Sequence, residues 1–169
     1  MVNTATREQL LEILTQVKDP ELPFIDIVEL GVVRDVALEE GTVVVSITPT
    51  YSGCPAIQVI EQEAVAALRD HGFDEVRVRT VFSPAWSTDW MSEETKQKFR
   101  DNGIAPPQGS SASGGIAELV SLRRARPTIE CPYCGSSNTV EKSEFGSTAC
   151  KSIHFCNGCH QPFDYFKAF

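Results

Sequence analysis

The sequence lacks several features that would assign whole classes of function. No apolar run approaches the roughly 20 residues that a helix needs to cross a bilayer, so we expect no contact with a membrane. The first eight residues have no apolar core of the kind found in secretory signals, which predicts a cytoplasmic location. A glycine-rich phosphate loop is also missing, and its absence argues against nucleotide binding.

Basic residues are scarce as well. The chain of 169 residues has 15 Lys and Arg against 23 Asp and Glu, which gives a net charge of −8. The acidic excess lies in residues 1–107, which hold 18 acids and 9 bases, whereas residues 108–169 hold 5 acids and 6 bases. Because binding to phosphates requires a basic surface, we do not expect nucleic acid as a partner.

The first 107 residues predict a small α+β domain. Thr6 and Gln9 have the spacing of a capping box, which marks the start of a helix. In chain order, the apolar patterns predict a helix from Thr6, strands over 32–38 and 42–48, a helix over 55–71, a strand over 75–82, and a helix from Ser92 to Gly103. This α-β-β-α-β-α order is typical of a compact two-layer domain.

Residues 108–126 are expected to form a linker and connecting segment. Residues 108–115 carry no bulky side chain, and residues 116–126 fit either a short helix or a strand. The remaining residues, 127–169, have few apolar side chains, so we expect them to fold as a small module that depends on a bound metal.

Six cysteines in a chain without a secretory signal are better interpreted as metal ligands or reactive thiols than as disulfides. Four of them form two CxxC pairs that are separated by 21 residues: Cys131 with Cys134, and Cys156 with Cys159. A two-residue spacer lets both sulfurs of a pair face one metal, and two such pairs complete a tetrahedron. We therefore expect a zinc-ribbon-like module with one structural zinc, its two cysteine turns joined by a hairpin.

Other interpretations of this tail remain open at the level of the sequence. An iron–sulfur cluster, a redox dithiol or a disulfide pair would use the same four cysteines. Cys150 could replace one of the four sulfurs, act as a possible extra thiol beside them, or be a buried core cysteine. His154 and His160 lie close by in sequence, but with four thiolates available we expect neither to bind the metal.

Cys54 is the chemically unusual residue of the first domain. It occupies the predicted N-cap of helix 55–71, where the positive helix end should stabilise its thiolate and lower its pKa. Asp19 and Glu21 offer carboxylates that, beside Cys54, could hold iron transiently if the fold brings them together. The alternative is that Asp19 caps a helix and Cys54 only fills space. No histidine lies in either segment, so a Cys–His catalytic pair is not expected.

Several motifs resemble known families. Asp-Pro-Glu-Leu-Pro at 19–23, Ile-Val-Glu-Leu-Gly-Val-Val at 27–33, and Gly-Cys-Pro at 53–55 resemble the SufT-like family of iron–sulfur assembly factors. The stretches at 84–92, 103–107, 131–136 and 143–151 resemble the PaaD family, the D components of bacterial phenylacetyl-CoA epoxidase systems. The similarity covers nearly the whole chain outside the linker, and the joint occurrence of domain and tail is more specific than any one motif.

The resemblance implies an accessory role in aerobic phenylacetate catabolism. The chain would help to mature an iron–sulfur or di-iron centre of the epoxidase system, carrying iron or a cluster only transiently, and would not be the catalyst. Its partners would be the reductase or oxygenase subunits of that system, with Cys54 as the functional thiol and Asp19 and Glu21 as its acidic companions. A non-catalytic structural subunit of the epoxidase is the alternative. Whether one chain or a homodimer acts is left open by the sequence.

Overall fold

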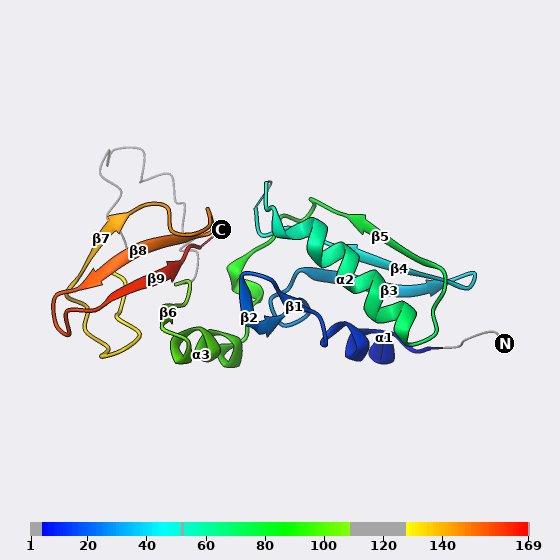
Figure 1. Cartoon of the computed structure of the whole chain (residues 1–169), viewed down its shortest axis with the longest axis horizontal. Coiled ribbons are helices and arrows are strands. Elements are labelled where there is room, and N and C mark those ends of the chain that lie inside the picture. The colour runs from blue at the N-terminus through cyan, green and yellow to red at the C-terminus, as the bar shows by residue number, and fades with distance from the viewer. Residues whose placement is uncertain (1–4, 52, 109–127, 169) are drawn as a thin grey trace, which may run out of the picture. The chain divides into compact units, whose positions relative to one another are not determined.

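The computed structural model describes residues 5–51, 53–108 and 128–168 (Figure 1). Contacts divide the chain into two compact units, Met1–Lys98 and Phe99–Phe169. The division falls inside α3 (Glu93–Asp101), whereas the domain boundary expected from the sequence is at residue 107. Residues 109–126 of the expected linker lie outside the described residues. Among the described residues, no helix is both long and apolar enough to cross a membrane.

The first unit is built on a three-stranded sheet in the order β3 (Val33–Glu39), β4 (Thr42–Ile47), β5 (Val76–Thr80). β3 and β4 form the expected antiparallel hairpin. β4 and β5 are parallel, because α2 (Ala56–Asp70) carries the chain back to the start of the sheet between them. The sequence did not predict a short antiparallel pair, β1 (Lys18–Asp19) with β2 (Leu22–Asp26), which precedes the sheet.

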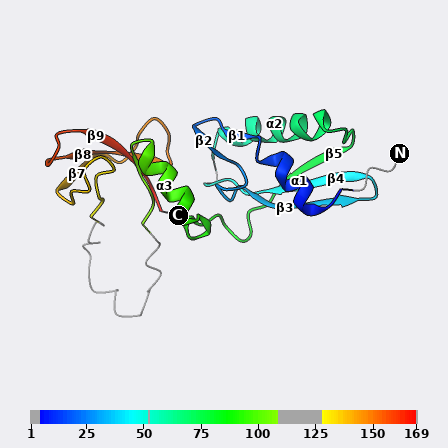
Figure 2. The same cartoon turned by 90° about the horizontal axis from the view of Figure 1, so that it is seen from below.

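The helices of this unit begin where the sequence places them. α1 (Arg7–Leu14) has the expected capping box: the Gln9 N–H donates to Thr6 Oγ1 at 3.3 Å, and the Thr6 N–H donates to Gln9 Oε1 at 2.9 Å. α1 packs against β3 and α2, and α2 packs against β5 (Figure 2). The core between helices and sheet contains fully or almost fully buried side chains from each layer: Leu10, Leu14, Val43, Val45, Ile47, Ile60, Ala64 and Leu68. The α-β-β-α-β-α order and the α+β class are confirmed.

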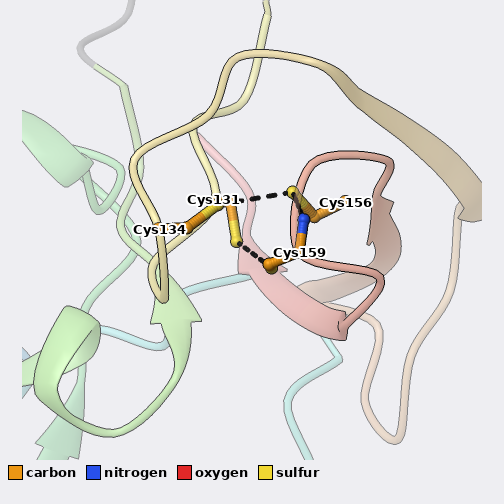
Figure 3. A group of neighbouring side chains, drawn as sticks. All are labelled: Cys131, Cys134, Cys156 and Cys159. Atoms are coloured by element: carbon orange, nitrogen blue, oxygen red, sulfur yellow. Dashed lines mark hydrogen bonds between the residues drawn. The ribbon is translucent and has the colours of Figure 1, made fainter.

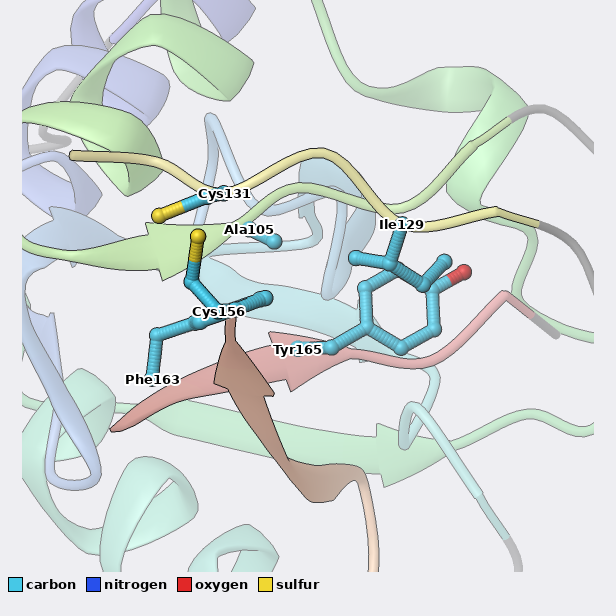
Figure 4. Close-up of a cluster of buried hydrophobic side chains, with 6 residues drawn as sticks. All are labelled: Ala105, Ile129, Cys131, Cys156, Phe163 and Tyr165. Carbon is cyan, nitrogen blue, oxygen red and sulfur yellow. The ribbon is translucent and has the colours of Figure 1, made fainter. Parts of the chain in front are cut away.

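The second unit contains a four-stranded sheet in the order β6-β9-β8-β7. The expected hairpin is present as β7 (Thr139–Ser143) and β8 (Lys151–Cys156). β9 (Pro162–Phe166) and β6 (Ile104–Ala105) were not predicted; β9 pairs antiparallel with β8, and β6 pairs parallel with β9. The small core of this unit includes two of the six cysteines, and its members are Ala105, Ile129, Cys131, Cys156, Phe163 and Tyr165 (Figure 4).

Candidate metal centre and thiol loop

Four cysteines from two turns converge in the second unit. Cys131 and Cys134 lie in the turn before β7, Cys156 ends β8, and Cys159 lies in the turn that leads to β9. Their four sulfur atoms all lie within 4.8 Å of one another (Figure 3). They form the one group of three or more His, Cys, Asp or Glu ligands that meets this distance in the part of the chain that the structure describes.

The spacing of the sulfurs fits one tetrahedral ion. A Zn–S bond of about 2.3 Å places the sulfurs of a tetrahedron about 3.8 Å apart. The Cys131–Cys159 and Cys134–Cys156 sulfur pairs are each 3.6 Å apart. A disulfide needs about 2.05 Å between its sulfurs, and all four cysteines are free. A cluster of several irons and sulfides does not fit inside a ring of sulfurs this tight, so the arrangement favours a single ion.

Backbone N–H groups support the sulfurs. The N–H groups of Gly158 and Cys159 donate to Cys156 Sγ at 3.3 and 3.5 Å. The Cys159 and Gly158 donors lower the pKa of Cys156 to about 6, whereas burial raises the pKa of Cys131 and raises that of Cys159 to about 12. Four neighbouring thiolates repel one another, and a divalent cation at their centre removes that repulsion. The donor set therefore suits zinc, which prefers closed four-thiolate sites.

The other polar residues of this module lie outside the four-sulfur group. Cys150 is buried, and its sulfur lies 3.0 Å from Thr148 Oγ1. His154 is also buried; its Nε2 lies 3.1 Å from Ser152 Oγ, and its ring stacks on Phe163. None of these side chains joins the metal group.

In the first unit, Cys54 lies in the loop between β4 and α2. The helix begins one residue later than the sequence predicts: Pro55 is the N-cap and no side chain caps the helix. The Cys54 side chain is half-buried. It is near enough to Asp19 and Glu21 for both carboxylates to act on its charge, so the fold does bring the acidic loop to the thiol.

The expectation of a lowered pKa at Cys54 was wrong. Burial is the largest effect and raises the pKa of the thiol, and the Glu21 and Asp19 carboxylates raise it further. The backbone N–H of Ala56 and the hydroxyl of Thr50 oppose this shift but do not overcome it. The resting thiol is therefore protonated at neutral pH, in a pocket of negative charge.

Asp19 has a second role in the same loop. It is only 7% exposed, and its Oδ1 accepts hydrogen bonds from the N–H groups of Glu21 and Leu22 at 2.8 and 2.9 Å. The carboxylate thus holds the β1–β2 turn, and does not cap a helix. Because the turn also carries Glu21, the geometry of the acidic loop depends on Asp19.

Two residues near Cys54 were not recognised from the sequence as parts of this site. Thr48 is buried and donates from Oγ1 to the carbonyl of Val81 at 2.9 Å, which ties the end of β4 to the chain leaving β5. Thr50 acts on the thiol through its hydroxyl. The Thr-x-Thr spacing just before Cys54 was the available signal, but only the fold shows what each hydroxyl contacts.

Family models match the two units separately. Residues 7–81 match the family described as iron-sulfur cluster assembly protein, and residues 117–167 match the PaaD zinc beta ribbon domain. The chain is 40% identical over 159 residues to an Escherichia coli protein named as the D component of a 1,2-phenylacetyl-CoA epoxidase, and the match covers 94% of this chain and 91% of that protein. These matches confirm the resemblance seen in the sequence.

Relatives of the first unit alone also exist. The Fe-S protein maturation auxiliary factor YitW of Bacillus subtilis is 39% identical over 94 residues, which cover 54% of this chain and 91% of that protein. A crystal structure of a domain of unknown function from Bacillus anthracis is 35% identical, covers 53% of this chain and 87% of that chain, and has a TM-score of 0.50. The first unit thus occurs as a protein by itself, and here the ribbon is joined to it.

Proposed function

This chain belongs to the family of the Escherichia coli protein named as the D component of 1,2-phenylacetyl-CoA epoxidase, and from this membership we propose that it is an accessory protein of iron–sulfur assembly. Its client would be an iron–sulfur or di-iron centre of such an epoxidase system, and it would not itself catalyse the epoxidation. The single observation that carries this proposal is the placement of the half-buried Cys54 thiol beside two carboxylates in the unit that matches the assembly family.

The thiol loop would act by exchanging a proton for a metal cation. Burial and two negative neighbours keep the Cys54 proton in place when no cation is near. The same two carboxylates attract a cation, and a bound cation favours the thiolate, so arrival of iron would release the proton. Departure of the iron would restore it. A site that is neutral when empty of cargo and charged when loaded suits transient holding better than permanent binding.

The ribbon would hold a resident zinc through Cys131, Cys134, Cys156 and Cys159. When bound there, zinc supplies cross-linking of the two cysteine turns and has no open position for chemistry. The chain's own residues supply the rest: N–H donors from Gly158 and Cys159 orient the sulfur of Cys156. The role of the module is then structural.

The test is to produce the epoxidase reductase together with this chain or with its Cys54→Ala variant. Reductase made with the variant should lose iron and the visible absorbance of its cluster, while the variant itself keeps its fold. Cys150→Ala is the matched control, because it also removes one buried thiol but lies outside both sites. If reductase made with Cys54→Ala is fully loaded, Cys54 has no part in maturation.

A second function, that of a non-catalytic structural subunit of the epoxidase, is favoured by the name of the Escherichia coli relative, which describes a subunit. Under this alternative the chain would co-purify at a fixed ratio with mature oxygenase, and Cys54→Ala would leave the metal content of every subunit unchanged. Under the maturation role the chain would be absent from the mature enzyme.

A further inference from the structure

The outer edge of β5 is open. The sheet order is β3-β4-β5, so each outer strand has one free edge among the described residues. The two edges differ: β3 has a register irregularity between Val33 and Asp35, whereas β5 keeps a regular register with β4 along its whole length. Bulges protect sheet edges from pairing, and a regular edge strand is a template for another strand.

The backbone of β5 offers a defined set of groups to such a strand. The Glu75 carbonyl accepts from Val43 N–H at 2.8 Å, and the Val81 N–H donates to the Ile47 carbonyl at 2.7 Å. In a parallel strand, alternate residues direct their backbone groups to the same side. The residues between these two bonds follow the same alternation, so Val76, Val78 and Thr80 direct their N–H and C=O groups to the open edge.

A groove runs beside this edge. It has a volume of about 560 Å³ and lies between α2 and β5, with apolar side chains in its middle and charged ones at its ends; its lining residues are Glu61, Gln62, Val65, Ala66, Arg69, Asp70 and Val78. Five residues of β5 span roughly 16 Å at about 3.3 Å each, which is the reach of a short extended peptide. An added strand would place every second side chain in this groove.

The opposite face of β5 selects the other side chains of that strand. Arg77 and Arg79 are both exposed there, and Arg79 Nε donates to Ser46 Oγ on β4 at 2.7 Å. A second copy of this chain paired edge to edge would bring arginines against arginines, which is unfavourable. Acidic side chains opposite the two arginines would instead form favourable cross-strand pairs.

We propose that the β5 edge and the α2–β5 groove bind an extended segment of a partner protein in which apolar and acidic residues alternate. The segment adds a fourth strand to the sheet: its backbone bonds to Val76, Val78 and Thr80, its apolar side chains enter the groove, and its carboxylates face Arg77 and Arg79. This is a binding role of the first unit that does not depend on the chemistry of Cys54.

The probe is a pair of blocked synthetic peptides, Thr-Glu-Val-Glu-Val-Glu-Thr and Thr-Lys-Val-Lys-Val-Lys-Thr, titrated into the full-length protein and followed by amide NMR. The Glu peptide should shift the amides of Val76, Val78 and Thr80 together with those of the groove. The Lys peptide should bind roughly fivefold more weakly or worse, because two cross-strand pairs change from attraction to repulsion.

Three variants sharpen this test. Arg77→Glu should reverse the preference between the two peptides, and Ala66→Gln should weaken both by filling the exposed groove without changing charge. Arg7→Glu is the control: it makes the same charge change beside β3, where Arg7 pairs with Asp35, and should leave binding unchanged. The proposal is overturned if the β5 amides do not shift, if the two peptides bind equally, or if β5 amides shift with protein concentration alone.

Discussion

Removal of zinc should unfold the second unit and leave the first intact. Two of the six residues in the ribbon core, Cys131 and Cys156, belong to the metal group. The other four would each contribute about 1.5–3 kcal/mol by burial, or about 6–12 kcal/mol together. A structural zinc contributes about 10–16 kcal/mol, so the metal contributes at least as much as the apolar core. Its loss exceeds the net stability of about 5–15 kcal/mol that a whole domain usually has.

The chain contains a reporter that separates the two units. Both tryptophans, Trp86 and Trp90, lie in the first unit. Chelation of the metal in the full-length protein should therefore leave the tryptophan emission unchanged, while the amide NMR signals of β8 and β9 lose their dispersion. Metal content is measured by elemental analysis before and after treatment, with one zinc per chain expected at the start.

Cys134→Ser is the sharpest variant for this prediction, because Cys134 is exposed and its replacement removes no core packing. Any loss of structure must then come from loss of the metal. Cys150→Ser is the matched control and should keep its zinc, since Cys150 lies outside the group. Dispersed β8 and β9 signals in metal-free protein, or iron in place of zinc in the purified chain, would refute the reasoning.

Three further predictions concern single residues. Alkylation of Cys54, followed by mass spectrometry across a pH series, should reach half its maximal rate at a higher pH than in the unfolded chain, because burial and two carboxylates raise its pKa; Glu21→Gln should lower that pH, and an unchanged profile would exclude the carboxylate's effect. Trp86→Phe should lower the free energy of unfolding in urea by about 1–3 kcal/mol, because the indole N–H donates to a buried backbone carbonyl at 3.0 Å; a loss under half that range would contradict this. Gly103→Ala should cost about 1–2 kcal/mol in the same assay, since Gly103 has φ +73° and a Cβ there would meet the Tyr133 hydroxyl at 2.5 Å; an unchanged midpoint would show that both can adjust.

Local patterns were enough to predict most elements of the first unit. The capping box at Thr6 and the hairpin of β3 and β4 depend on residues that are neighbours in sequence, so their patterns survive without knowledge of the fold. β1, β2, β6 and β9 were missed for the opposite reason. β6, for example, has two residues and exists because β9, some sixty positions later, pairs with it.

The candidate sites divide in the same way. Each CxxC pair was recognisable, because a two-residue spacer by itself turns two sulfurs to one side. That the two pairs meet within 4.8 Å depends on the pairing of β7, β8 and β9. The open edge of β5 also exists only in three dimensions, because it requires β5 to pair with β4 alone among the described residues.

Cys54 shows the limit most clearly. The sequence by itself determined that a thiol precedes a helix and that an acidic loop lies earlier in the chain. The helix end, a local feature, favours the thiolate and led to the expectation of a lowered pKa. The tertiary structure alone determined the opposite sign, because burial and carboxylates from residues more than thirty positions away outweigh the local N–H donor. Charge and solvent act through space, so the ionisation of a side chain follows from the fold and not from its neighbours in the chain.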